Sequence, residues 1–338
     1  MFGLRNVVEA TKITPAPPET TDKHRGHTAP GPGPTPPAGT RRPADAPVSC
    51  RRNREEQDVL LAASVKVPEL SSGQFNAVYN LFSLAIASLA FTGLFLVLSQ
   101  RRVVARYRNA LVVSAMVCFI ATYHYVRIFQ NFKESYKTTS QGGSGPFKLT
   151  NIEFNEAYRY VDWFLTVPLL LVETIAVLAL ARAVAKPLLT KLVIASGLMI
   201  ALGYPGEVSS DTGTRLLWGT LSTIPFIYLL YVLFVELSKS LDRQPLEVRG
   251  TVSKLRIMLV GLWGVYPIAY LFPVFGFSGA GGFVARQAGY SIADILAKAA
   301  FGLVIFKIAR FKSEADDPSF DEDHEMGDLV ADRSSVRA

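Results

Sequence analysis

A lysine stands in the middle of the last long apolar run of this 338-residue chain. Within YSIADILAKAAFGLVIF, Lys298 has eight residues on each side, and the one acid in the run, Asp294, lies four residues before it. A charged side chain near the centre of a bilayer costs about 2.5 to 3.5 kcal/mol on insertion scales, so such a lysine is expected to serve a function. The position therefore predicts a buried functional site with an acidic partner.

Seven apolar stretches are long enough to cross a bilayer, which takes about 17 to 25 residues of helix. With 49% hydrophobic residues and a mean hydropathy of +0.25, the chain is too apolar for an ordinary soluble domain. The stretches are 77–99, 109–130, 154–181, 188–206, 214–237, 255–276 and 286–309. The fourth is the least regular, because Gly197, Gly203 and Pro205 interrupt it. We predict an all-α membrane protein, a bundle of seven transmembrane helices.

Basic residues gather in the loops after the first, third and fifth stretches. They are Arg101, Arg102, Arg106, Arg108, Arg182, Lys186, Lys191, Lys239, Arg243, Arg249, Lys254 and Arg256. Because cytoplasmic loops carry an excess of Lys and Arg, we expect the N-terminus outside, or in a lumen, and the C-terminus in the cytoplasm. The formal net charge of +7 follows mostly from this bias, so we expect no nucleic-acid partner.

The two ends of the chain differ in composition from the middle. Residues 1–72 are rich in proline, as in APGPGPTPPAGTRRP, and we expect them to form a disordered tail. Whether this tail includes a segment that targets the protein to an organelle stays an open alternative. Residues 313–338 turn acidic, as in DDPSFDEDHE, and we expect a second disordered tail. The domain between them is then 73–312.

Within the third stretch, the segment RYVDWFLTVPLLLVE from Arg159 to Glu173 carries its polar residues on one side. At 100° per residue, Asp162, Thr166 and Glu173 fall within about 40° of one another, and Arg159 lies about 60° away. Asp162 and Glu173 are separated by about 16 Å along the helix axis, too far for direct contact. The order in depth suits a proton relay across the membrane.

Two acids and an arginine around Lys298 can keep the lysine charged. The third and seventh stretches run in the same direction, so Asp294 and Lys298 can face Asp162 at a similar depth. The alternative is a buried ion-pair network that only fixes helix packing. Packing does not require acids placed in depth order, so we favour the functional interpretation.

At these residues the chain resembles the microbial rhodopsins, and among them the proteorhodopsin and xanthorhodopsin group of light-driven proton pumps. The resemblance covers about residues 75–312 and rests on RYVDWFLTVPLL, WGVYPIAY and DILAK. It implies all-trans retinal bound to Lys298 as a protonated Schiff base. It also implies Asp162 as proton acceptor and counterion, with Asp294 as second counterion, and Glu173 as cytoplasmic proton donor.

The resemblance assigns further roles around this centre. Thr166 would hydrogen-bond Asp162, Arg159 would form the outward gate, and His124 would hydrogen-bond the acceptor, although a membrane histidine can equally cap a backbone group. The expected retinal pocket consists of Tyr160, Trp163, Trp218, Trp263, Tyr266, Pro267 and Tyr270. Such an aromatic stripe also occurs in ordinary helix packing. No metal site is expected.

Gly219 occupies the position where bacteriorhodopsin-like pumps place a second tryptophan over the retinal ring, and xanthorhodopsin-like pumps have glycine there. A glycine would open a window through which a carotenoid could touch retinal as an antenna. The alternative is a small residue that lets helices approach closely.

One stretch departs from bacteriorhodopsin-type pumps. Residues 275–290 hold no acid for a proton-release group, and Arg286 stands there instead, so we expect late release to the outside.

The residue types favour protons as the transported ion. A sodium pump of this group would carry Asn, Asp and Gln where Asp162, Thr166 and Glu173 stand, and a chloride pump would lack the acid at 162. A sensory rhodopsin with a signalling partner, a light-gated channel and a seven-helix hormone receptor remain open alternatives. We expect contact with membrane lipids, a homo-oligomer, and a place in the plasma membrane or an organelle membrane.

Overall fold

The computed structural model describes residues 67–138, 145–178, 182–241 and 246–320. The first 66 residues and residues 321–338, where most of each predicted tail falls, lie outside this description. The helices are α2 (Ser72–Leu98), η2 (Ser99–Arg102), α3 (Ala105–Ser135), α4 (Ala157–Leu178), α5 (Arg182–Glu207), α6 (Thr212–Leu241), α7 (Leu246–Tyr270), α8 (Ala280–Asp294), the π-helix η3 (Ile295–Ala300), α9 (Phe301–Asp316) and η4 (Pro318–Phe320).

Six of these helices, α2 to α7, are long and apolar enough to cross a membrane. The helix of the seventh crossing runs without a break from Ala280 to Asp316, past the end of the apolar stretch 286–309, and the π turn around Lys298 divides it into the shorter α8, η3 and α9. The predicted seven-helix bundle is confirmed. The fourth stretch, despite Gly197, Gly203 and Pro205, is one continuous helix, in keeping with the tolerance of membrane helices for Gly and Pro.

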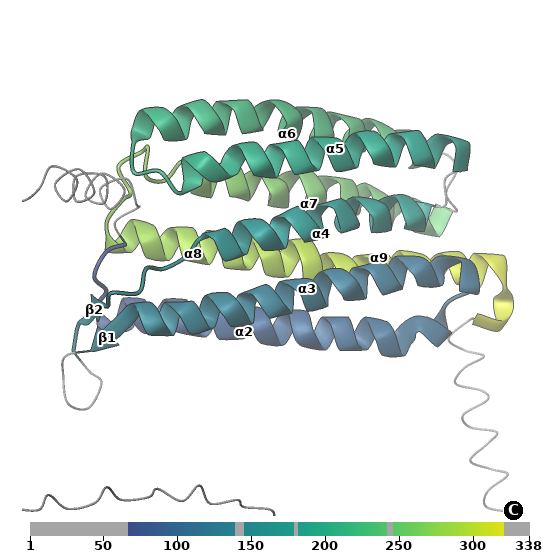
Figure 1. Cartoon of the computed structure of the whole chain (residues 1–338). Coiled ribbons are helices and arrows are strands. Elements are labelled where there is room, and N and C mark those ends of the chain that lie inside the picture. The colour runs from purple at the N-terminus through teal and green to yellow at the C-terminus, as the bar shows by residue number, and fades with distance from the viewer. Residues whose placement is uncertain (1–66, 139–144, 179–181, 242–245, 321–338) are drawn as a thin grey trace, which may run out of the picture. The chain divides into compact units, whose positions relative to one another are not determined.

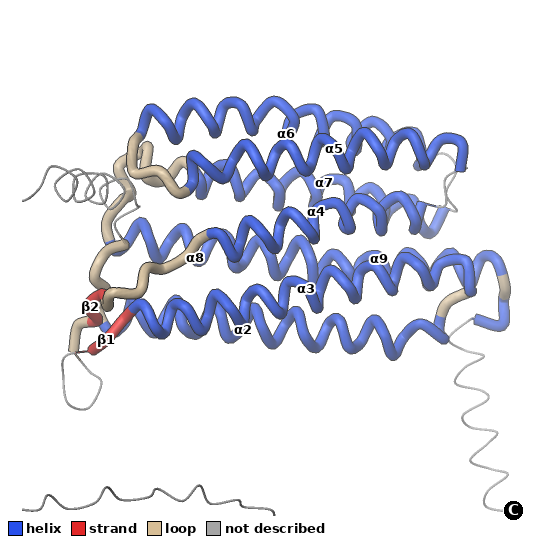
Figure 2. Tube along the Cα trace, in the orientation of Figure 1, coloured by secondary structure: helices blue, strands red, loops and turns tan. Residues whose placement is uncertain are grey.

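The helices run roughly parallel to one another in a bundle (Figure 1). Consecutive helices contact each other, and α8 with η3 returns to pack against α2, so the helices close into a ring. The helices dominate the described chain, and the strands β1 (Tyr136–Thr138) and β2 (Phe147–Leu149) form a short antiparallel pair at one end (Figure 2). Leu70 bridges to Phe147 beside this pair, and the ring of Phe147 stacks on Phe75 at 3.9 Å. These contacts tie the start of α2 to the hairpin.

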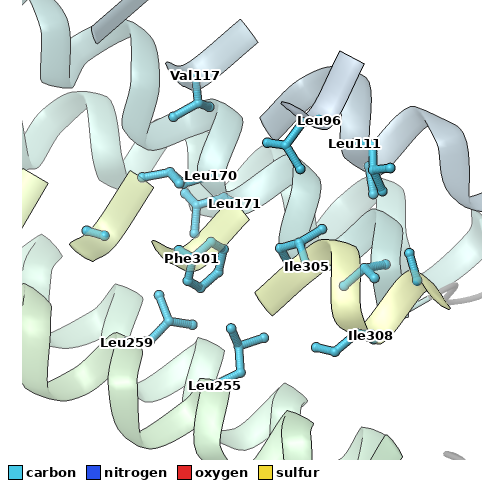
Figure 3. Packing of buried hydrophobic residues seen from close by; sticks show 14 of the residues in the cluster. Leu96, Leu111, Val117, Leu170, Leu171, Leu255, Leu259, Phe301, Ile305 and Ile308 are labelled. Atoms are coloured by element: carbon cyan, nitrogen blue, oxygen red, sulfur yellow. The ribbon is translucent and has the colours of Figure 1, made fainter. Parts of the chain in front are cut away.

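The helix ring has an apolar surface on its inside and another on its outside. Inside, leucines and isoleucines interdigitate around Phe301, as Figure 3 shows for Leu171, Leu259 and Ile305. Outside, large apolar side chains face away from the protein, among them Phe91 and Ile224, which are 70% and 65% exposed. An exposed apolar band of this extent suits lipid rather than water. Charged side chains within the bundle lie in the interior, where burial favours their pairing, and this is where the site lies.

Candidate functional site

Lys298 lies in the π turn, and its ammonium sits between two carboxylates from different helices. It donates a hydrogen bond to Oδ2 of Asp162 on α4 and lies 3.1 Å from Oδ1 of Asp294 at the end of α8. All three side chains are almost fully buried. The predicted pairing of the third and seventh stretches is therefore present in the fold.

Asp294 is held by three further donors. Tyr125 donates to its Oδ2 at 2.7 Å, while Trp163 and Tyr266 donate to its Oδ1 at 3.1 and 2.8 Å. Oδ1 of Asp162, in contrast, is buried with no hydrogen-bond partner among the described residues. Asp294 is thus fixed as an acceptor of hydrogen bonds, whereas Asp162 keeps an oxygen free to take a proton.

His124 and Thr166 flank Asp162 but bond to the main chain. Nδ1 of His124 lies 2.9 Å from the carbonyl oxygen of Ile120 and 3.9 Å from Oδ1 of Asp162, which is longer than a hydrogen bond. The hydroxyl of Thr166 donates to the backbone carbonyl of Asp162 at 2.8 Å. Thr166 thus bonds the main chain of Asp162, and neither Thr166 nor His124 bonds the Asp162 carboxylate. The backbone cap foreseen as an alternative for His124 is the bond that the geometry shows.

Arg159 lies next to this centre, one turn before Asp162 on α4. Its Nη1 forms an ion pair with Oδ2 of Asp294 at 3.7 Å and donates a hydrogen bond to the Tyr125 hydroxyl at 3.0 Å. Its Nη2 donates a hydrogen bond to Oε1 of Gln287 at 2.7 Å. The guanidinium thus connects the lysine centre with the groups nearer the hairpin end of the bundle.

Beyond Arg159 lies a cluster that sequence reasoning missed. Arg286 bonds Glu156 at 3.0 Å and Glu207 at 2.9 Å. Glu207 also pairs with Arg215 at 3.5 Å and accepts from Tyr290 at 3.2 Å. We call this group, with Arg159 and Gln287, the arginine-rich end.

The acids of the arginine-rich end lie outside residues 275–290, where the absence of acids predicted late proton release. Glu156 precedes α4 and Glu207 ends α5, whereas the expectation considered only 275–290. A signal was available, because Arg286 lies inside a predicted span and needs acids at its own depth. The ends of the neighbouring spans were where those acids could be found.

Glu173 occupies the opposite end of α4 in very different surroundings. It is 1% exposed, and neither carboxyl oxygen has a hydrogen-bond partner in the described ranges. Leu170 and Leu171 before it belong to the apolar cluster around Phe301 (Figure 3). Burying a charged carboxylate without a partner is very costly, so this environment suits a neutral, protonated carboxyl.

A mostly apolar cavity of about 290 Å³ leads away from Lys298 between α4, α5, α6 and α7. Predicted residues that line it are Tyr160, Trp163, Gly219, Trp263, Tyr266, Pro267 and Tyr270. Lining residues that were not predicted include Met199, Ile200, Phe226 and Tyr290, which look like any other apolar helix residues in the sequence.

Trp218 was expected in this cavity but is not one of the residues that line it. One residue along a helix is a turn of 100°, so Trp218 and Gly219 face different neighbours. A Cβ built on Gly206 of α5 would lie 3.1 Å from the Cβ of Trp218. The Cβ of Trp218 therefore lies against α5.

Two glycines make room for Tyr270. A Cβ on Gly219 would come within 2.7 Å of the Tyr270 ring, and a Cβ on Gly206 would collide with its hydroxyl. That hydroxyl donates to the carbonyl of Arg215 at 2.8 Å. Close packing of this tyrosine is thus a sufficient physical reason for glycine at 219.

The sequence matches known proteins over the same region. The family model for "bacteriorhodopsin-like protein" matches residues 76–311. A green-light absorbing proteorhodopsin from the gamma-proteobacterium EBAC31A08 is 29% identical over 231 residues, which are 68% of this chain and 84% of that protein. Archaerhodopsin-2 of Halobacterium sp. (strain aus-2) is 33% identical over 174 residues, 50% of this chain and 64% of that protein.

Two solved structures resemble the fold at higher identity. A thermophilic rhodopsin is 46% identical with a TM-score of 0.70, and xanthorhodopsin, described as a light-driven ion pump with dual chromophore, is 45% identical with a TM-score of 0.69. Each alignment covers 74% of this chain and 99% of the other. The predicted resemblance to the proteorhodopsin and xanthorhodopsin group is confirmed. The chain is a multi-pass integral membrane protein and belongs to the bacteriorhodopsin-like family, the microbial rhodopsins.

Proposed function

We propose that the protein is a light-driven outward proton pump that carries all-trans retinal on Lys298. The observation that carries the proposal is the buried ammonium of Lys298 between Asp162 and Asp294, with Glu173, which has no hydrogen-bond partner among the described residues, farther along α4. The relatives named above are pumps or rhodopsins and give no reason to expect a classical enzyme.

The residues present fit retinal. The rhodopsin family binds retinal, and here an apolar cavity with aromatic walls ends at the one lysine that lines it. Ala297 and Ala299 beside Lys298 have small side chains, which leaves room for a bulky adduct. When bound, retinal would supply the absorption of light and a light-driven change in the proton affinity of the Lys298 nitrogen.

The chain's own residues then move the proton. Asp162 accepts it from Nζ of Lys298, because its carboxylate already bonds that nitrogen and has a free oxygen. Asp294, held by its three donors, stays in place as the second counterion. Arg159 leads from this centre toward the arginine-rich end, and Glu173 returns a proton to Lys298 from the other side.

The direction follows from the basic loops. The proposed cytoplasmic face holds the α2–α3 connection with Arg101 and Arg102, and this face also holds the ends of α4 and α9. The arginine-rich end then faces outward. A proton leaves toward the outside and is replaced from the cytoplasm, with release late in the cycle because Glu156 and Glu207 are both bonded to arginine.

The test is a light-driven pH change in cells or vesicles supplied with retinal, with and without a protonophore. External acidification that the protonophore abolishes supports the pump. A photocurrent that reverses sign with voltage would identify a channel instead. Normal pigment without any net transport would favour a sensory rhodopsin, and failure to form pigment would overturn the proposal.

We further propose a carotenoid antenna as a finer feature of the same pump. The supporting observation is that Gly219 and Thr220 of α6 line the cavity, while the neighbouring Leu216 and Leu217 are exposed on the outside of the helix ring. Tyr270 beside Gly219 favours the alternative, close packing only.

The discriminating measurement is the action spectrum of pumping after a hydroxylated or keto carotenoid is added. An antenna predicts a carotenoid band that is lost in Gly219→Trp. Gly261→Trp is the matched control, because a side chain there has open space around it, and it should keep the band. No induced band with several xanthophylls would leave Gly219 as a packing residue.

The domain limits, the oligomeric state and the host membrane stay predictions. The described α9 runs to Asp316, a few residues past the expected domain end at 312. Cross-linking in native membranes would show whether the proposed homo-oligomer forms, and a fluorescent fusion would show whether the plasma membrane or an organelle holds it.

A further inference from the structure

A second buried lysine lies at the proposed cytoplasmic end. Lys312 is 6% exposed and stands beyond the apolar stretch 286–309, near the end of α9. Its Nζ donates to the backbone carbonyl of Val177, near the end of α4, at 3.0 Å. The pumping steps described above make no use of this amine.

No carboxylate pairs with Lys312 in the part of the chain that the structure describes. Its ammonium lies 5.2 Å from the ring centre of Tyr107 on α3. The nearby acid, Asp316, already accepts from Tyr107 at 2.6 Å and pairs with Arg106 at 3.1 Å. Burial, with a smaller contribution from Arg106 that Asp316 opposes, lowers the pKa of Lys312 to about 8. An amine of this kind can both take and give a proton near neutral pH.

Two helices lead from Lys312 toward Glu173. Val177 follows Glu173 by one turn of α4, about 6 Å along the axis. On α3, Ser114 lies two turns after Tyr107 and within about 20° of it around the axis. The hydroxyl of Ser114 is buried without a hydrogen-bond partner among the described residues, as are both carboxyl oxygens of Glu173. The described parts of α3 and α4 thus hold three buried polar atoms without a hydrogen-bond partner, within two turns of the residues that Lys312 contacts.

We propose that Lys312 is the proton-uptake residue that recharges Glu173 from the cytoplasm. The inference rests on the proposed pump and adds a step to it. After Glu173 has given up its proton, an N–H bond of the Lys312 ammonium breaks and the proton passes through intervening water to a carboxylate oxygen of Glu173. The amine keeps the electron pair and then takes a proton from cytoplasmic water.

The test separates proton transfer from the hydrogen bond to Val177. Lys312→Met removes both, whereas Lys312→Arg keeps a cationic donor that does not release its proton in proteins. Recovery of the Glu173 carboxyl is followed by time-resolved infrared absorption, and uptake by a pH-indicator dye. We expect both variants to slow the recovery about tenfold or more, while proton transfer from Glu173 to Lys298 keeps its rate.

The pH profile gives a second readout. In the native protein, recovery should slow as pH rises through about 8, since the amine then loses the proton it would donate. That break should be absent from both variants. Normal recovery in Lys312→Arg, with slowing in Lys312→Met alone, would mean that Lys312 only positions α4 and would overturn the proposal. Failure of the pump itself is distinguishable, because the native protein would then show no light-driven acidification.

Discussion

At the arginine-rich end, Glu156 and Glu207 are both bonded to Arg286, whereas Glu173 at the other end of the same bundle has no bonding partner among the described residues. Both regions are buried, and both lie on the route proposed for the proton. They differ in whether their acids are paired with cations. A carboxyl group buried in a membrane protein can thus be stabilised in two ways. It can be ionised and paired with arginine, or it can be neutral among leucine side chains.

Charge balance sharpens this contrast. From the lysine centre to the arginine-rich end, four cations face four acids: Lys298, Arg159, Arg215 and Arg286 against Asp162, Asp294, Glu156 and Glu207. This set has no net charge when every member is ionised. A proton moved from Lys298 to Asp162 keeps the set neutral, while a proton lost from Glu173 creates a new charge at an apolar site.

Removing the central cation should have the largest effect. Lys298→Ala should give no visible pigment with retinal, because among the described residues no other lysine lines the cavity. The measurement is the absorption spectrum after retinal is added to purified protein. Lys307→Ala, an exposed lysine on the same helix, should form pigment normally. A normal chromophore in Lys298→Ala would disprove the central assignment.

The next largest effect is expected at the acceptor. Asp162→Asn should still bind retinal but absorb at longer wavelength and stop pumping, since the acceptor and one of the two counterion charges are gone. Absorption and light-driven pH change measure the two consequences. Asp211→Asn alters an exposed acid and serves as control. Pumping at the native rate in Asp162→Asn would remove Asp162 from the route.

A smaller effect should follow from Glu173→Gln. The amide is neutral like the protonated acid, so retinal should bind normally, but the proton's return to Lys298 should slow by about 100-fold or more. Flash photolysis measures this return. Glu134→Gln changes an exposed acid on α3 and should leave the rate alone. If Glu173→Gln keeps the native rate and pH dependence, another group is the donor.

At the arginine-rich end, the effect expected first is a loss of stability. Arg286→Met leaves the buried Glu156 and Glu207 without their shared partner, which should destabilise the protein by about 3 to 5 kcal/mol. Thermal loss of pigment in detergent measures the change. Arg101→Met, at an exposed arginine, should have little effect. An unchanged melting temperature in Arg286→Met would mean that these acids are protonated or solvated, and would weaken the comparison.

The seven helices and the lysine centre could be predicted because each depends on local sequence. Long apolar stretches show the helices, and Lys298 stands out by its charge within one of them. Asp162 and Asp294 were found because helical spacing places them on faces that can meet the lysine. For Asp294 this reasoning needs only one turn of helix, whereas for Asp162 it also needs the common direction of the third and seventh stretches and the family resemblance.

The arginine-rich end depends on contacts that spacing along one helix does not reveal. Its charged residues come from three separate segments: Glu156, Glu207 and Arg286. They meet only because the start of α4, the end of α5 and the first half of α8 lie side by side. The placement of Trp218 in the cavity was predicted from the sequence alone, and it fails for a similar reason. Successive residues of a helix point about 100° apart, so Trp218 and Gly219 contact different neighbours. The exact rotation of each helix is set by packing.

The π turn at Ile295–Ala300 bears on how the seventh helix tolerates changes of length. Its backbone hydrogen bonds reach one residue farther than in an α-helix, so the segment holds an extra residue without disturbing the helices on either side. A one-residue deletion elsewhere in this helix would rotate everything beyond it by about 100°, carrying Lys312 and Ser313 away from their partners on α4 and before α3. A deletion at Ala300 could be absorbed by converting the π turn to α-helix. The lysine centre is therefore also the place where the seventh helix can change length and keep both of its ends in register.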